Sequence, residues 1–311
     1  MALRSAVVLG GSGLVGSRVL ELWADLQIVA PGHADLDVLD ADALATFLRL
    51  SDADVVVNVA AWADVDGAEA EGGNTAGRVY ALNAAFPERL ANLCGELNKH
   101  LVHVSTDYVF DGTNDERPYR EDEPTRPVCW YAETKLAGER AVQGSGAQAC
   151  IARIEMPFTG RDHRKRDLAR TICERLRAGQ PITGVLDQRI TPTFLDDAVH
   201  AFRLLAEARY TGTVHVAAAD WTTPLRFARS IAERLGLNAD LIQPESFDTF
   251  ALKRVATRPQ HSWLDVSLFA ELFGADVLRP VESELDSWVA QLLTVPSAAR
   301  TLRNPEKING T

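Results

Sequence analysis

The stretch Gly10-Gly11-Ser12-Gly13-Leu14-Val15-Gly16 decides the fold, because it separates two patterns of different period. Before it, residues 5–9 form a short apolar run typical of a buried strand, and after it residues 14–22 repeat apolar side chains with helical spacing. Glycines at such a turn allow positive φ and close backbone approach, and the new helix offers free N–H groups to a pyrophosphate. The spacing fits both GxxGxxG and GxGxxG, and a tight turn without a ligand is the competing interpretation. The residues expected to contact a dinucleotide are Gly10, Gly13, Leu14, Val15 and Gly16.

Short β-branched runs alternate with amphipathic patterns through the first half of the chain. The strand-like runs are residues 5–9, 27–30, 54–58, 101–105 and 150–154. The helix-like patterns are residues 14–22, 41–50, 78–97 with an expected kink at Pro87, and 131–142. Strands that alternate with helices form parallel sheets covered on both faces. We therefore predict an α/β fold with a doubly wound, Rossmann-like parallel sheet.

Beyond about residue 155 the alternation becomes less regular. Helical patterns occur at residues 167–178, 196–208, 224–235 and 282–293. A strand-like run at residues 214–217 is expected to return to the main sheet, so that the second part of the chain is interleaved with the first. These patterns predict a dinucleotide-binding domain (1–155), a smaller substrate-binding lobe (156–295) and a tail (296–311) with turn formers and no periodicity.

The composition limits the classes of partner and site. A net charge of −11 and a pI near 5.2 argue against nucleic acid or an anionic membrane as general partners, because phosphate binding needs surplus Lys and Arg. No apolar run approaches the ~20 residues of a membrane helix, and the amino terminus leads into a strand without a signal pattern. The four cysteines, Cys94, Cys129, Cys150 and Cys173, lack metal-like spacing. We expect a cytoplasmic protein without metal or disulfides.

The end of the second predicted strand bears on the choice between NAD and NADP. An acidic residue there holds the ribose 2′-hydroxyl of NAD and repels the 2′-phosphate of NADP. The chain reads Ala30-Pro31-Gly32-His33-Ala34, without an acid, which favours NADP over NAD. Further on, Asp37 is predicted either to accept a hydrogen bond from the adenine amino group or to cap the following helix.

Tyr131 and Lys135 are four residues apart in a helical pattern, so they share one helix face. A phenol is a poor acid near neutral pH unless a cation stabilises its phenolate, and Lys135 can supply that charge. Thr106 ends a predicted parallel strand, at the edge where doubly wound folds bind ligands. The three residues predict reduction of a keto group, with Tyr131 as proton donor, a nicotinamide as hydride donor and Thr106 polarising the carbonyl. A strand cap and an ordinary amphipathic helix face are the competing interpretation.

Several segments together resemble a known family. They are residues 10–16, 58–66, Val104-Ser105-Thr106-Asp107-Tyr108-Val109-Phe110-Asp111-Gly112, residues 118–122 and 131–139, Asp187-Gln188 with Thr191-Pro192-Thr193, and Arg258-Pro259 with Ser262-Trp263-Leu264-Asp265. The match runs from the first strand to about residue 290. On these residues the chain resembles the dTDP-4-dehydrorhamnose reductase-like branch of the extended short-chain dehydrogenases.

The resemblance implies reduction of a 4-keto group on a dTDP-linked 6-deoxysugar by NADPH or NADH. The substrate is then a nucleotide sugar, and a homodimer is compatible with the sequence. The implied catalytic residues are Thr106, Tyr131 and Lys135. The implied cofactor contacts are Ala60, Ala61 and Trp62 together with Tyr131 and Lys135, and the implied sugar contacts are Thr106 and Asp107.

The segment after the fifth predicted strand departs from the family pattern. The family has an Arg-Thr-x-Trp segment closed by Tyr-Gly, whereas this chain reads Arg153-Ile154-Glu155-Met156-Pro157-Phe158-Thr159-Gly160. Met156 is therefore expected at the sugar in place of an aromatic residue, and Cys129 stands where Asn is common. Arg161 opens the basic run of residues 161–166 and is predicted to meet the substrate diphosphate, with a solvated loop as the alternative. These departures concern the sugar and leave the redox chemistry unchanged.

Two other functions compete with reduction. A non-catalytic regulatory subunit, like the beta subunit of methionine adenosyltransferase, can resemble this family and retain its motif. A sugar-nucleotide epimerase uses the same tyrosine with a transient keto intermediate. Dehydratases of the superfamily usually carry an Asp-Glu pair after the threonine, and here Asp107 is followed by Tyr108, which argues against a dehydratase.

Overall fold

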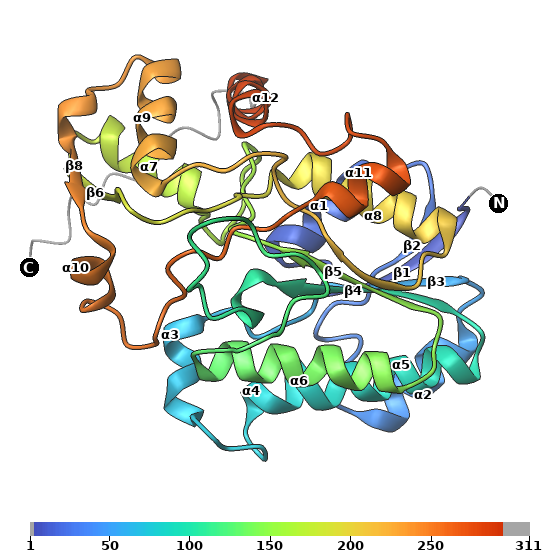
Figure 1. Cartoon of the computed structure of the whole chain (residues 1–311). Helices are drawn as coiled ribbons and strands as arrows, with labels where there is room; N and C mark the ends of the chain where they lie inside the picture. Colours follow the sequence, from blue (N-terminus) through green and yellow to red (C-terminus); the bar gives the residue numbers. More distant parts are fainter. Residues whose placement is uncertain (1–2, 295–311) are drawn as a thin grey trace, which may run out of the picture.

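The computed structural model describes residues 3–294, and these contain a six-stranded parallel sheet (Figure 1). Its strands, in spatial order, are β2 (Gln27–Val29), β1 (Ser5–Leu9), β3 (Val55–Asn58), β4 (His100–Thr106), β5 (Ala149–Ile154) and β7 (Gly212–His215). Every neighbouring pair is parallel. The predicted doubly wound α/β fold is confirmed.

Each face of the sheet is covered by its own helix layer, because successive strand residues point to opposite sides. Val7 packs in one apolar cluster with Leu44 and Leu90, and Val8 packs in another with Val19 and Phe202. The first layer contains α2 (Ala41–Leu50), α5 (Phe86–Glu96) and α6 (Trp130–Gly144), and the second contains α1 (Leu14–Leu22), α8 (Leu195–Ala208) and α11 (Ser267–Phe273) (Figure 1). Burial on both faces explains why the strands are continuous apolar runs.

The strand order reverses at β1 and β3, whose carboxyl ends lie together at the edge where such sheets bind ligands. Gly10 follows β1 with a φ of +91°. A Cβ at Gly10 would lie 2.6 Å from the nitrogen of Ala60, which follows β3. The close approach of these two segments therefore requires glycine at this position.

The helical pattern predicted at residues 78–97 is interrupted. It consists of α4 (Arg78–Tyr80), a π-helical turn at Ala81–Ala85 and α5, with Pro87 in the first turn of α5. Pro87 has no N–H and cannot donate to the carbonyl of Asn83, four residues earlier. Gly138 of α6 packs on that carbonyl, since a Cβ at Gly138 would lie 2.2 Å from its oxygen. The expected irregularity is present, centred just before Pro87.

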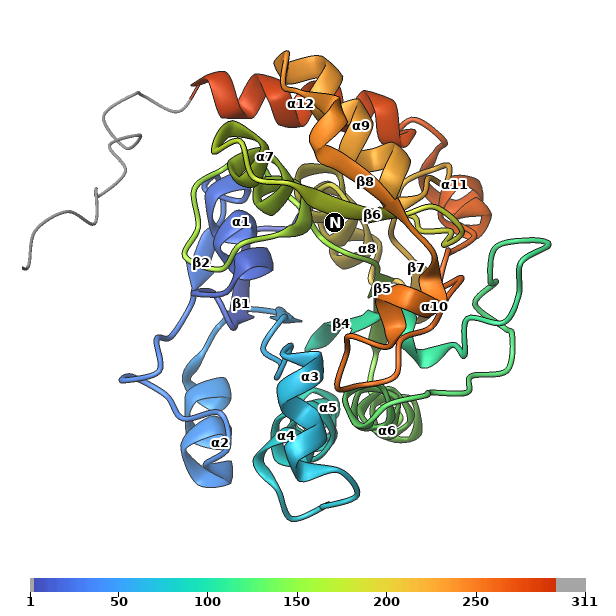
Figure 2. The ribbon, with the colours of Figure 1, turned by 90° about the vertical axis from the view of Figure 1, so that its left-hand side faces the viewer.

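A smaller lobe has an apolar core of its own, which includes Ile172, Ile231 and Trp288. It contains α7 (Leu168–Arg177), α9 (Pro224–Leu235), α12 (Val281–Thr294) and a parallel strand pair, β6 (Ile182–Val185) and β8 (Ile242–Glu245). Figure 2 shows these elements on the side of the sheet opposite to α2 and α6. The pattern analysis did not predict β6, β8, α3 (Val65–Ala68), α10 (Phe247–Ala251) or α11.

The chain returns from the lobe to the main sheet, as expected. The returning strand is β7, which pairs with β5 and begins two residues before the predicted run. The domain boundary at residue 155 stays a prediction, and the predicted tail at residues 296–311 lies outside the described residues.

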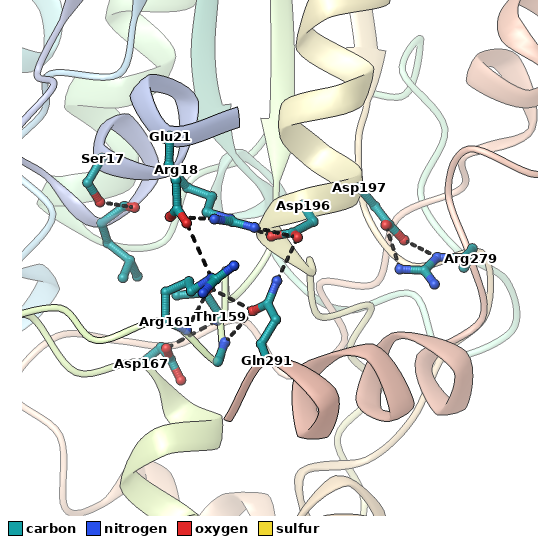
Figure 3. Close-up of polar contacts among 12 residues, drawn as sticks. Ser17, Arg18, Glu21, Thr159, Arg161, Asp167, Asp196, Asp197, Arg279 and Gln291 are labelled. Carbon is teal, nitrogen blue, oxygen red and sulfur yellow. Dashed lines mark hydrogen bonds and ion pairs between the residues drawn. The ribbon is translucent and has the colours of Figure 1, made fainter. Parts of the chain in front are cut away.

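A polar network joins the lobe to the helices on the sheet (Figure 3). Arg18 of α1 donates to both carboxylate oxygens of Asp196 on α8, at 2.6 Å each. Gln291 of α12 also donates to Asp196, at 2.6 Å, and accepts from the nitrogen of Gly160 at 2.9 Å. Arg18 is buried, so this network holds the segment after β5 and helix α12 against the sheet layer.

Within residues 3–294, no helix combines the length and apolar character needed to cross a lipid bilayer. In the same range, no three side chains of the metal-binding types gather into one group. Cys94, Cys129, Cys150 and Cys173 are buried and form no disulfide bond with one another.

Candidate active site

The glycine-rich turn forms a backbone cradle at the start of α1. The nitrogen of Gly13 donates to the carbonyl of Gly10 at 3.0 Å, and a Cβ at Gly16 would lie 2.2 Å from the same oxygen. Gly13 is the N-cap of α1 and no side chain caps the helix, so Leu14 and Val15 begin a helix whose N–H groups are free for a ligand. Free N–H groups and the positive end of the helix dipole fit a dinucleotide pyrophosphate.

The segment after β3, formed by Ala60, Ala61 and Trp62, borders this cradle. Asn58 Oδ1 accepts from the nitrogen of Ala60 at 3.1 Å, and Asn83 Oδ1 accepts from the nitrogen of Trp62 at 2.8 Å. Asn83 also donates to the carbonyl of Trp62 and to Thr134 Oγ1 of α6, at 3.1 Å each. Asn83 thus ties the predicted cofactor segment to the helix that carries Tyr131. Sequence reasoning missed Asn83, and a polar residue within an apolar helical pattern was the available signal.

The loop after β2 contains carboxylates, although none lies at the strand end itself. Asp35 Oδ2 accepts from the nitrogen of Gly32 at 3.0 Å. Asp37 Oδ1 accepts from the nitrogen of Leu39 at 2.9 Å, and α2 is capped by Asp40 instead. The helix-cap alternative for Asp37 is therefore wrong, because Asp40 directly precedes the helix, and the adenine contact of Asp37 stays a prediction.

Tyr131 of α6 and Thr106 at the end of β4 meet at the carboxyl edge of the sheet. Both are buried, with exposed fractions of 9% and 6%, and their side chains are hydrogen-bonded. Burial raises the pKa of Tyr131, and the bond to Thr106 opposes that rise only in part. The sequence argument expected a lower pKa from the neighbouring ammonium, whereas burial and the charge of Asp107 raise the pKa of Tyr131 here. The phenol consequently carries its proton at neutral pH, as a proton donor must.

Lys135 lies one helical turn after Tyr131 and is buried. Its Nζ donates to the carbonyl of Val104 in β4 at 2.9 Å. Burial lowers the pKa of Lys135 to about 8, and the negative charge of Glu139 opposes this. The helix itself is anchored at its first residue, where Glu69 Oε1 accepts from the nitrogen of Trp130 at 2.7 Å. Glu69 is a second positioning residue that the sequence analysis did not identify.

Asp107 lies beside Thr106 and is almost fully buried. Thr106 Oγ1 donates to Asp107 Oδ1 at 2.9 Å, whereas Oδ2 has no hydrogen bond to any residue within 3–294. Burial raises the pKa of Asp107. A buried oxygen without a partner is costly in an isolated protein, and either a ligand hydroxyl or a proton on the carboxyl group itself would satisfy it.

Met156 follows β5 with a φ of 41°, a conformation that non-glycine residues seldom adopt. Such backbone strain concentrates at functional sites. Its side chain is partly exposed, in contrast to the buried Glu155 before it. The predicted contact between Met156 and the sugar is compatible with this position and stays a prediction.

Arg161 is directed toward α1, where its Nε lies 3.4 Å from Glu21 Oε1 (Figure 3). His163 Nε2 donates to the carbonyl of Ser12 at 3.2 Å, so the basic loop borders the glycine-rich turn. Two other charges of the loop are also paired, Arg166 with Glu174 and Asp162 with Arg170. The pairing of Arg161 favours an anchoring role, and its contact with a substrate diphosphate stays a prediction.

Comparison of the amino-acid sequence with known proteins shows the family of this chain. Residues 4–294 match the family model described as the RmlD substrate binding domain. The dTDP-4-dehydrorhamnose reductase of Mycobacterium tuberculosis is 33% identical over 303 residues, which cover 95% of this chain and 96% of that protein. The chain belongs to the dTDP-4-dehydrorhamnose reductase family. The resemblance expected from the motifs is confirmed, and the members are NAD(P)-dependent oxidoreductases.

Other members of this reductase family agree in sequence and in structure. The dTDP-4-dehydrorhamnose reductase of Mycolicibacterium smegmatis is 35% identical over 296 residues, covering 92% of this chain and 85% of that protein. The crystal structure of the dTDP-4-dehydrorhamnose reductase of Bacillus anthracis, in complex with NADP, has a TM-score of 0.84 at 23% identity and covers 94% of this chain and 100% of that chain. The second comparison shows that the two chains share one fold.

Proposed function

We propose that this chain uses NADPH to reduce the 4-keto group of a dTDP-linked 6-deoxysugar. One observation carries the proposal: Tyr131 is buried and hydrogen-bonded to Thr106, one turn from Lys135, at the sheet edge that also carries the glycine cradle. The family assignment supports the reaction, because its curated members are reductases of such a nucleotide sugar.

The side chains take complementary roles in this proposal. Tyr131, protonated at neutral pH, gives its proton to the substrate oxygen as the keto group becomes an alcohol. Thr106 lies beside the phenol and polarises the same carbonyl. Lys135 is held by the Val104 carbonyl on the helix face shared with Tyr131, where an ammonium stabilises the phenolate that forms. A bound nicotinamide supplies the hydride.

The glycine turn and the segment after β3 would hold the dinucleotide. The cradle fits a pyrophosphate, and residues 60–62 are fixed against α6 by Asn83. The absence of an acid at the end of β2 supports NADP, as does the NADP complex of the Bacillus anthracis relative. We further propose a cytoplasmic enzyme, consistent with four cysteines that form no disulfide bond with one another, and a homodimer, which light scattering would test.

The test is to follow NADPH and NADH oxidation with a panel of nucleotide-linked 4-keto sugars. The wild type should turn over a dTDP-linked 4-keto-6-deoxysugar with NADPH. Tyr131→Phe should lower kcat by roughly 10²–10⁴-fold, because it removes the proton donor while leaving the ring that packs against Tyr108. Unchanged turnover in this variant would remove Tyr131 from the mechanism. No turnover with any substrate, while NADPH still binds, would favour a regulatory subunit.

A further inference from the structure

The buried carboxyl groups of Asp107 and Glu155 interact electrostatically, and Asp107 is hydrogen-bonded to the proposed catalytic residue Thr106. Asp107 follows β4 and Glu155 follows β5, and these strands are neighbours in which Thr106 pairs with Ile154. Asp107 is 2% exposed and Glu155 is 0% exposed. Glu155 belongs to the segment in which this chain departs from the family pattern, so the pair is a feature of this chain's own sequence.

Glu155 is held by donors from two distant segments. Its Oε2 accepts from the nitrogen and from the Oγ1 of Thr191, at 2.6 Å each, and its Oε1 accepts from Ser262 Oγ at 2.9 Å. Thr193 fixes the backbone on both sides, since its Oγ1 accepts from the Glu155 nitrogen and its nitrogen donates to the Glu155 carbonyl. Glu155 is therefore rigidly placed.

Ser262 connects Glu155 with Asp107. The Ser262 hydroxyl lowers the pKa of both carboxyl groups. It has only one proton, however, and it donates that proton to Glu155. Asp107 Oδ2 is left without a donor among the described residues. A proton on Asp107 would satisfy this oxygen and complete a hydrogen-bonded chain from Asp107 through Ser262 to Glu155.

In the described part of the chain, no positively charged side chain compensates the charges that Asp107 and Glu155 would carry if both were ionised. Within residues 3–294, neither Asp107 nor Glu155 forms an ion pair with a lysine or arginine. The groups facing Asp107 are Tyr108, Tyr131, Thr106 and Ser262, and those facing Glu155 are Thr191, Ser262 and Asp107. The nearby Arg258 forms an ion pair with Asp66 instead, and its charge lowers the pKa of Tyr108. Burial raises the pKa of both members, and the negative charge of Asp107 raises the pKa of Glu155 further, as expected for two buried acids at one site.

We propose that Asp107 and Glu155 hold one proton between them across Ser262, and that this proton reprotonates Tyr131 through Thr106 in each turnover. The inference rests on the proposed reductase function. The groups needed for this transfer are already in contact, because Tyr131 is hydrogen-bonded to Thr106 and Thr106 Oγ1 lies 2.9 Å from Asp107 Oδ1. The Thr106 hydroxyl donates to Asp107 in this state and must turn to donate to the phenolate. Glu155 is a positioning residue in this scheme, because it acts through Asp107.

The proton balance closes over one cycle. Tyr131 transfers its phenolic proton to the substrate oxygen and becomes a phenolate. The phenolate takes the hydroxyl proton of Thr106. Rotation of the Asp107 carboxyl group then turns its protonated oxygen toward Thr106 Oγ1, which takes that proton. The pair is then a dianion in a buried site, which is unfavourable, and it regains one proton from water when the alcohol leaves.

The decisive measurement is the pH profile of kcat in the wild type and in Glu155→Gln. The rate should be lost as the pH rises through the pKa of the shared proton. Glu155→Gln keeps the side-chain size and removes the negative charge that holds this pKa up, so the loss should begin about one pH unit lower or more. Glu155→Asp retains the charge and should restore the wild-type profile. Ser262→Ala keeps both charges and should lower kcat without moving the profile to lower pH.

A spectroscopic readout keeps this proposal separate from the reductase proposal. The difference between infrared titrations of the NADP-bound wild type and Glu155→Gln should show one protonated buried carboxyl that only the wild type has at neutral pH. Other buried acids whose pKa is raised, such as Glu284, contribute to both proteins and cancel in the difference. Absence of this difference signal, or an unshifted pH profile in a folded Glu155→Gln that binds NADPH normally, would overturn the shared proton. If the wild type reduces no keto sugar but the infrared signal is present, the reductase function fails and the relay fails with it, while the shared proton stands.

Discussion

The cofactor-facing and sugar-facing sides of the site lie at one edge of the sheet but are assembled differently. The cofactor side comes from residues 10–16 and 59–62, two segments that each directly follow a strand. The sugar side brings together Asp107, Glu155 and the distant residues Thr191 and Ser262. A contiguous segment carries its geometry in its own spacing, whereas a site gathered from loops depends on the whole fold. Substitutions that force the backbone to move should therefore impair the cofactor side most. Substitutions that change a charge should impair the sugar side most.

Gly16→Ala should have the largest effect among the changes that test this contrast. A Cβ at Gly16 would lie 2.2 Å from the Gly10 carbonyl, so the turn must shift. Overpacking costs about 1–3 kcal/mol, which corresponds to roughly 10–100-fold weaker NADPH binding if the strain falls on the cradle. Gly13→Ala meets the same oxygen at 3.3 Å and should lose less. Equal affinities of both variants and the wild type in calorimetry would contradict the proposed cradle.

Gly138→Ala should have the second-largest effect. It tests the packing of α6 on Asn83, which positions both the cofactor side and the sugar side. Its Cβ would lie 2.2 Å from the Asn83 carbonyl, and the displacement of α6 should lower the free energy of unfolding by about 2 kcal/mol and also lower kcat. Gly144→Ala is the matched control in the same helix, because the added carbon would meet no atom within 4 Å apart from its chain neighbours and the adjacent helix backbone. Urea unfolding compares the two, and equal losses would refute a specific contact at Asn83.

Lys135→Met tests how much burial of the Lys135 amine, which lies between the two sides, lowers the free energy of unfolding. The pKa of Lys135 is lowered from 10.5 to about 8 in the folded protein, so the unfolded chain binds more protons between these values. The free energy of unfolding of the wild type should therefore rise with pH through this window, by up to about 1.4 kcal/mol per pH unit from this group. Urea unfolding at pH 8 and 9.5 should show that rise relative to Lys135→Met. Parallel pH dependence of the two proteins would mean that Lys135 keeps its ordinary pKa.

Arg161→Gln should have the smallest effect. Arg161 is 38% exposed and lies 3.4 Å from Glu21, an arrangement in which ion pairs contribute less than about 1 kcal/mol. We expect less than about a threefold change in the KM of the nucleotide sugar and unchanged NADPH binding. A rise of tenfold or more in that KM would instead assign Arg161 to the substrate diphosphate.

The sequence was sufficient for the parts of the molecule with local patterns. The sheet strands, α1 and the placement of Thr106, Tyr131 and Lys135 at one edge follow from periodicity and from where each strand ends. β6 and β8 escaped prediction because they have four residues each, with Gly184 and Pro244 interrupting any strand pattern. Tertiary pairing stabilises them where local propensity does not.

The candidate site shows the same division. Glu69, Asn83 and the link between Asp107 and Glu155 depend on side chains that meet only after folding. The direction of the pKa of Tyr131 was also beyond sequence, because it depends on how much solvent the fold removes from the phenol. Sequence spacing predicts which side chains are neighbours on one helix, but their pKa values depend on how deeply the fold buries them.

The return of β7 to the main sheet affects how the protein comes apart. The chain leaves the sheet after β5, returns for α8 and β7, leaves again for α9 and β8, and comes back for α11. Neither part can detach without breaking strand pairs or helix packing in the other. A single protease cut between them should leave two fragments that stay associated, and heating should melt both parts in one transition.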